Sequence, residues 1–318
     1  GTARVPFALL FGALGVLGLY SAWKADRAIF AYLFVLVGTL SVGLIIQLNF
    51  KYGYSLYPEI TDGLLHEVRE RDYFYVGSFL LWGALAGIGL GWVWHTIAGM
   101  GGGVRRYARM APVLLLAVIP LVFNWSWASR SGDYAARDWA YDLLISVEPY
   151  GVLFTNGDND TFPLWYVQEV EGIRQDVTVI VGQYLMTTWY PKQLQALTRV
   201  DRQRVFDPDL VPDLFSDPGV PTEPIVDLTH DQMDQVAAVR LQEDLPISFP
   251  GIVVRYPADM VLDRGHQLAL TIIKASIDER PIYFASAGGL MAELGLERWG
   301  VRHGLAVKLE MRSLTAET

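Results

Sequence analysis

Four long apolar runs dominate the first part of the chain. They occupy residues 5–23, 29–48, 73–97 and 110–127. Each approaches or exceeds the roughly 20 residues that cross a bilayer core as a helix, and none contains Asp, Glu, Lys or Arg. Because backbone groups in lipid have no water to bond with, such runs are expected to be helical. The pattern predicts a region of four transmembrane helices over residues 1–130.

The third run carries three regularly spaced glycines. Gly83, Gly87 and Gly91 lie four residues apart and therefore share one face of a helix. Small residues at this spacing let two helices approach closely. We expect this face to pack against a neighbouring helix, whether of this chain or of another.

Beyond residue 130 the pattern changes to short apolar runs that alternate with amphipathic stretches. The runs at 151–156, 177–182, 251–256, 281–286 and 304–311 are typical of strands. Helical spacing marks the stretches 133–149, 162–171, 191–198, 230–242, 265–278 and 288–295. Residues 201–224 are rich in Pro and Asp without a period, which indicates a long surface excursion. Strands that alternate with helices predict an α/β domain with a mainly parallel sheet over residues 131–318.

The charge of the chain divides at the same place. Residues 1–130 carry 10 Lys and Arg against 6 Asp and Glu, whereas residues 131–318 carry 15 against 28. The second part is therefore strongly acidic, and we expect no nucleic-acid partner, because binding to phosphates needs a basic face. The chain has no cysteine, which excludes disulfides and thiol chemistry.

The short connections between the apolar runs predict an orientation. Lys24 and Arg27 lie in the first connection, and Arg105, Arg106 and Arg109 lie in the third. The middle connection, residues 49–72, has more acids than bases. Since cytoplasmic loops are enriched in Lys and Arg, the first and third connections are expected in the cytoplasm. By alternation, the α/β domain is expected on the extracytoplasmic side.

The stretch TNGDNDTFPLWY, residues 155–166, is the strongest chemical candidate. It follows a predicted strand and precedes a predicted helix, and ligands of α/β domains commonly bind at such edges. Asn156, Asp158, Asn159 and Asp160 are candidate ligand-binding residues, because their oxygens suit Ca²⁺ or Mg²⁺. Asp158 and Asp160 are the candidate metal ligands. The alternative is a structural turn, in which Asp160 or Thr161 caps the helix and Pro163 lies in its first turn.

Two weaker candidates lie outside this stretch. The segment SAGG, residues 286–289, falls between a strand and a helix, where its backbone amides could bind an anion or simply form a tight turn. The histidines at 66, 95, 230, 266 and 303 show no metal-binding spacing, so we expect no metal site built from them.

Three stretches of the chain resemble a known family. Residues 70–89, 124–180 and 280–286 are similar to a bacterial membrane-protein family catalogued as domain of unknown function 2723 and related to protein O-mannosyltransferases of the GT-C type. The resemblance implies a multi-pass enzyme of the bacterial inner membrane with its C-terminal domain on the periplasmic side. Such an enzyme transfers a sugar from a polyprenyl-phosphate carrier to a protein Ser or Thr.

The resemblance covers only the C-terminal part of such an enzyme. The catalytic acid of GT-C enzymes lies in the first extracytoplasmic loop, which would precede Gly1, so no catalytic residue can be assigned on this chain. The alternative function is that of a non-catalytic structural or assembly subunit of a larger membrane complex, for example a respiratory or photosynthetic one. The expected partners are the lipid bilayer and, in the second case, other proteins of the complex.

Overall fold

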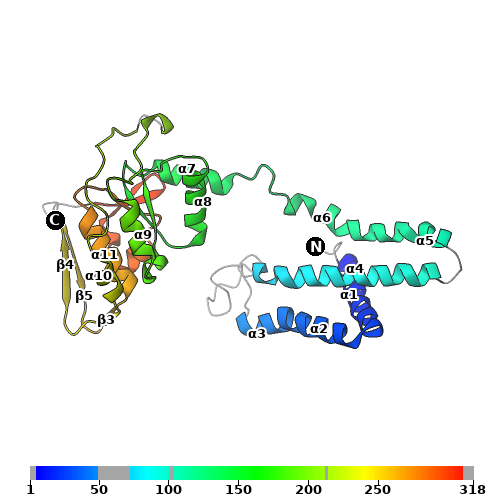
Figure 1. The fold of residues 1–318 in the computed structure, drawn as a ribbon. Coiled ribbons are helices and arrows are strands. Elements are labelled where there is room, and N and C mark those ends of the chain that lie inside the picture. Colours follow the sequence, from blue (N-terminus) through cyan, green and yellow to red (C-terminus); the bar gives the residue numbers. More distant parts are fainter. Residues whose placement is uncertain (1–4, 49–71, 100–103, 212–213, 311–318) are drawn as a thin grey trace. The chain divides into compact units, whose positions relative to one another are not determined.

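The computed structural model describes residues 5–48, 72–99, 104–211 and 214–310. The chain divides into two compact units, Gly1–Ser131 and Gly132–Thr318, which are described separately below (Figure 1). The first unit is helical throughout its described residues, and the second contains both helices and strands.

The first unit confirms the four predicted apolar helices. Its α-helical segments are α1 (Val5–Ala25), α2 (Arg27–Gly38), α3 (Leu44–Leu48), α4 (Val76–Gly99), α5 (Val104–Met110) and α6 (Ile119–Ala128). A π-helical turn joins α2 to α3, and a 3₁₀ segment that contains Pro112 joins α5 to α6. Four continuous stretches are long and apolar enough to cross a membrane: Val5–Ala25, Arg27–Leu48, Tyr73–Gly99 and Arg106–Ala128.

Helices α1 and α4 pack closely through glycines. A Cβ atom at Gly18 would overlap the carbonyl oxygen of Leu85, and a Cβ at Gly89 would overlap that of Leu14. The backbones therefore touch at these positions, which only glycine permits. The face that the sequence singled out is a different one, because a Cβ at Gly83, Gly87 or Gly91 would meet nothing within 4 Å among the described residues.

Replacement of Gly89 by alanine tests this contact, with Gly87→Ala as the matched control on the open face of the same helix. Alanine in a helix is favoured over glycine by about 1 kcal/mol, so Gly87→Ala should leave the thermal stability of the chain unchanged or slightly raised. Gly89→Ala should lower the stability by about 1–3 kcal/mol, because α1 must move away from α4. Thermal unfolding in nanodiscs measures the difference, and equal melting temperatures would contradict the packing.

The second unit contains a five-stranded sheet in the order β2-β1-β7-β9-β8. Its strands are β1 (Val152–Thr155), β2 (Thr178–Val181), β7 (Ile282–Phe284), β8 (Gly300–His303) and β9 (Ala306–Leu309). Strands β2, β1 and β7 are parallel, and β9 and β8 extend the sheet as an antiparallel hairpin. The α/β region with its mostly parallel sheet is therefore confirmed, with two antiparallel strands at one edge.

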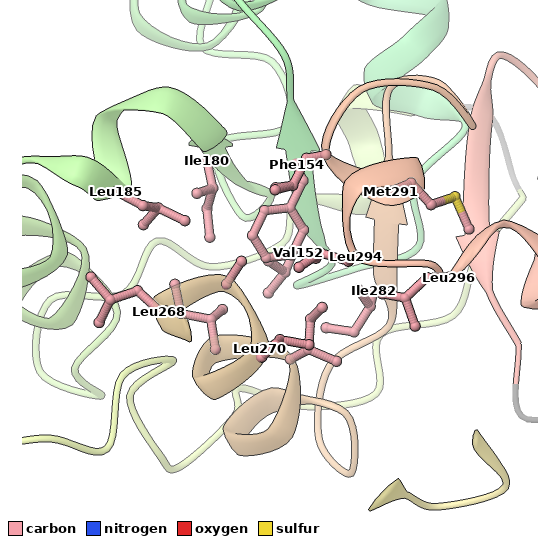
Figure 2. Close-up of a cluster of buried hydrophobic side chains, with 14 of the residues drawn as sticks. Val152, Phe154, Ile180, Leu185, Leu268, Leu270, Ile282, Met291, Leu294 and Leu296 are labelled. Atoms are coloured by element: carbon pink, nitrogen blue, oxygen red, sulfur yellow. The ribbon is translucent and has the colours of Figure 1, made fainter. Parts of the chain in front are cut away.

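Helices cover both faces of this sheet. The helices of the unit are α7 (Ala135–Ile145), α8 (Asp158–Glu169), α9 (Tyr190–Leu197), α10 (His230–Gln235), α11 (Arg264–Ser276) and α12 (Leu290–Glu293). Val152 and Phe154 of β1 point to the core that contains α11, whereas Leu153 points to the core formed with α7 and α8. Figure 2 shows the first of these cores, in which strand side chains meet Leu268 of α11. Alternate residues of one strand thus serve two cores, as the period of a strand requires.

An ion pair buried in the second unit fixes the approach to β1. The guanidinium of Arg174 binds both carboxylate oxygens of Asp176 at 2.9 and 3.0 Å, and their side chains are 1% and 2% exposed. Arg174 also donates to the carbonyl oxygens of Leu144 and Val147 at the end of α7, and Asp176 accepts the backbone N–H of Tyr150. The guanidinium and the carboxylate are thus hydrogen-bonded to each other and to backbone groups, which is the condition under which a buried charge is tolerated.

The structure differs from the predicted elements at several places. The helix predicted over 230–242 ends at Gln235, because Val239–Arg240 forms strand β3 and pairs with β6 (Val261–Leu262). A hairpin of β4 (Leu245–Phe249) and β5 (Ile252–Tyr256) forms a separate two-stranded sheet. Strands β3, β4, β6 and β8 were not predicted, because most of their residues are exposed or half-buried and they carry no long apolar run.

Candidate functional site

The neighbouring parallel strands β1 and β7 lead into helices on opposite faces of the sheet. The chain that leaves β1 enters α8, whose Leu164 packs in the core with α7. The chain that leaves β7 enters α12, whose Leu290 packs in the core on the other face of the sheet. The two connections therefore diverge to opposite faces. This is the topological switch point at which ligands of open α/β sheets bind.

Asn156 links the connection that follows β1 to the one that follows β7. Its amide nitrogen donates to the hydroxyl of Ser286 at 3.1 Å, and its amide oxygen accepts the backbone N–H of Leu290 at 3.0 Å. Gly289 has φ 60°, and a Cβ there would overlap the Asn156 side chain, so glycine is required. The structure thus brings together Asn156 and the SAGG segment, two candidates that lie far apart in the sequence. Because Asn156 already binds the first N–H of α12, that amide is not open to an anion.

A hollow of about 180 Å³ adjoins Asn156. The ends of β1 and β2 and the starts of α11 and α12 form its walls, and the polar side chains on them include Gln183, Asp263, His266 and Glu293. Each of these four wall segments belongs to a helix or directly follows a strand. A preformed concave site with a few converging polar groups is typical of small-molecule binding.

His266 lies between two carboxylates in the wall of the hollow. Its Nδ1 atom is 3.3 Å from Oδ1 of Asp263, and its Nε2 atom is 3.3 Å from Oε2 of Glu293. Asp263 is also the N-cap of α11, since it accepts the backbone N–H of His266 at 2.8 Å. The sequence missed this group because Glu293 reaches His266 only through the fold. The available signal was the Asp263 N-cap three residues before His266.

The other predicted site residues do not line the hollow. The carboxylate of Asp160 accepts the backbone N–H groups of Asn156 and Gly157, both at 2.8 Å, so it closes the turn between β1 and α8. Asp158 and Asn159 are exposed in the first turn of α8. Within the described ranges, no group of three or more His, Asp or Glu side chains is placed to hold a metal ion. A Ca²⁺ or Mg²⁺ role for Asp158 and Asp160 stays a prediction.

Helix α8 begins four residues before its predicted start, at Asp158 rather than at 162. The Asp160 carboxylate explains the early start, because it satisfies N–H groups that would otherwise lack partners at the end of β1. Thr161 donates its hydroxyl to the carbonyl oxygen of Gly157, which adds a second bond to the same turn. Pro163 consequently lies inside the helix, and its predicted place in the first turn was wrong.

A second, wider groove of about 830 Å³ runs along β5. Arg255 and Arg298 line it, and Arg298 donates to the carbonyl oxygen of Val253. This groove borders a two-stranded hairpin and does not lie at the carboxyl ends of the parallel strands. We therefore place the candidate site in the smaller hollow.

The comparison with known families corrects the resemblance drawn from the sequence. The model of TMEM260-associated domain 2 matches residues 136–202, the part of the chain that runs from α7 through α9. The domain of unknown function 2723 and the O-mannosyltransferases give no family match, so that identification was wrong. The longest stretch on which it relied, residues 124–180, lies largely inside the matched region. No curated protein and no solved structure matches the chain.

The role of Asp160 can be tested against Asp158, a carboxylate two residues away on the same turn. Asp160→Ala should lower the free energy of unfolding by about 1–2 kcal/mol, because it leaves two backbone N–H groups without their acceptor. Asp158→Ala should cost less, about 0.5 kcal/mol, since only the favourable interaction with the helix dipole is lost. Chemical denaturation of the full chain measures both.

The same two variants distinguish a structural role of the carboxylates in the turn from a role in binding a metal ion. If Asp160 acts through the backbone, its replacement should lower stability equally in Ca²⁺, in Mg²⁺ and in chelator. A loss that appears only when the ion is present would show that the carboxylates hold a metal.

Proposed function

We propose that this chain is a membrane-anchored binding protein whose α/β domain holds a small, neutral, hydroxyl-rich molecule at the carboxyl ends of β1 and β2. The observation that carries the proposal is the hollow at the switch point, with polar side chains from four separate segments around it. Its place in the sheet is the one at which α/β folds bind ligands. The four long apolar helices support anchoring in a membrane.

The lining favours hydroxyl groups over anions. Asp263 and Glu293 accept hydrogen bonds, Gln183 both donates and accepts them, and none of the described residues that line the hollow is Lys or Arg. A phosphate or carboxylate ligand would therefore face two carboxylates without a compensating cation. The volume equals about six water molecules at about 30 Å³ each, so the ligand is of small-molecule size.

Sugar transfer is not part of this proposal. It was inferred from a family resemblance that the family comparison contradicts. The proposal belongs instead to the non-catalytic class that the sequence left open, in which the chain serves as one component of a membrane assembly. The protein partners of such an assembly stay a prediction.

We propose further that the α/β domain lies on the extracytoplasmic side. The connection between α1 and α2 carries Lys24 and Arg27, and the start of the fourth apolar stretch carries Arg106 and Arg109. Basic connections of this kind stay in the cytoplasm. Ser131, after the last apolar stretch, then lies on the opposite side.

The absence of cysteine makes this orientation directly testable in intact cells. Ser131→Cys should react with a membrane-impermeant maleimide added from outside, whereas Ala28→Cys should react only after the membrane is permeabilised. The reverse pattern of labelling would place the α/β domain in the cytoplasm and contradict the proposal.

Binding can be tested with two probes: D-glucose and inorganic phosphate. D-glucose should raise the melting temperature of the full chain in nanodiscs, and phosphate should not. Glu293→Gln should weaken glucose binding roughly tenfold, the equivalent of about 1.4 kcal/mol, because a hydrogen bond to a charged acceptor is lost. Glu297→Gln is the matched control, since Glu297 is exposed and outside the hollow. Binding of phosphate alone, or of no probe, would refute the proposed ligand class.

A further inference from the structure

An apolar stripe runs along the exposed side of α8. Phe162, Tyr166 and Val170 lie four residues apart and are 50%, 48% and 69% exposed. The opposite side of the helix is fully buried, with Leu164 and Val167 in the core shared with α7. One helix thus has two apolar sides, and only one of them is covered by the described residues of the α/β unit.

Two carboxylates beside the stripe are paired with arginines of the domain. The guanidinium of Arg204 donates hydrogen bonds to both carboxylate oxygens of Glu169 at 2.6 and 2.9 Å, and Arg137 forms an ion pair with Glu171. These pairings lower the pKa of both carboxyl groups. Asp158, one turn before the stripe, stays exposed at the start of the helix. The paired residues leave apolar contact as the main attraction along the stripe itself.

The chain itself keeps the domain close to a bilayer. The last apolar stretch ends at Ala128, and α7 begins at Ala135. Residues 129–134 alone connect them, and such a stretch reaches at most ~20 Å at about 3.4 Å per residue. Helix α8 packs directly on α7, as Figure 1 shows, so the stripe belongs to the part of the domain that follows the tether.

We propose that the stripe Phe162, Tyr166 and Val170 docks on the surface of the lipid bilayer, with the two aromatic rings at the level of the headgroups. Aromatic side chains favour this interface because the ring is apolar and the tyrosine hydroxyl stays hydrated. An amphipathic helix buries its apolar side at the boundary between headgroups and acyl chains. The paired carboxylates and the exposed Asp158 fit a zwitterionic lipid such as phosphatidylcholine better than an anionic one. This inference rests on the proposed membrane anchoring and is independent of the ligand in the hollow.

Spin labels in the naturally cysteine-free chain test the docking. Phe162→Cys, Tyr166→Cys and Val170→Cys are each labelled with a nitroxide in the full chain, reconstituted into phosphatidylcholine vesicles. Oxygen concentrates in the bilayer and a nickel chelate stays in water, so the ratio of their collision rates with the label reports depth. The ratio should be higher at all three positions than at Val253→Cys, an exposed apolar control on β5 of the same domain.

Two outcomes would overturn the docking. Equal ratios at the stripe and at Val253 would show that the stripe faces water. Labels shielded from both reagents would show that protein covers it. Val35→Cys on α2 tests the anchoring separately, because an exposed residue of an inserted helix must contact lipid. A water-like ratio at Val35 would refute the anchoring together with the docking. Melting temperatures of the labelled variants confirm that each one is folded.

Discussion

The way in which β1 ends is the constraint on which the second unit depends. At Asn156 and Gly157 the chain must leave the sheet and start α8, and the Asp160 carboxylate makes this possible by accepting both backbone N–H groups. The turn leaves the Asn156 side chain free to cross to the connection that follows β7, where it hydrogen-bonds Ser286 and Leu290. One carboxylate and one amide thus join β1, α8, the connection after β7 and the start of α12, and Asn156 and Leu290 both line the hollow.

The opposite end of β1 is fixed by an equally definite interaction. The buried pair of Arg174 and Asp176 binds the end of α7 and the residue Tyr150, just before the strand. Both ends of β1 are therefore set by polar groups, while its four residues are buried between two apolar cores. This division of roles explains why the candidate site is preformed: the strand cannot shift along the sheet without breaking bonds at one end or the other.

Much of this architecture could be predicted from periodicity, because a run of about 20 apolar residues or a short buried strand is a local property of the sequence. The carboxyl edge that contains Asn156 was predicted in the same way. The partners of Asn156 and the pairing of His266 with Glu293 could not be, since both depend on contacts between distant segments. Strand β8 and the early start of α8 were not predicted for another reason. Pairing with β9 fixes the strand, and the Asp160 acceptor fixes the start of the helix, although the local sequence preference for either is weak.

The central claim is that the hollow at the carboxyl ends of β1 and β2 binds a hydroxyl-rich ligand, and hydrogen–deuterium exchange of the full chain in nanodiscs tests it most directly. Exchange measured by mass spectrometry with and without D-glucose reports which backbone amides the ligand protects. The account predicts slower exchange in residues 155–156, 182–186, 263–266 and 289–293, which contain the lining of the hollow, and no change in the hairpin 245–256. Protection confined to that hairpin, or no protection anywhere, would contradict it.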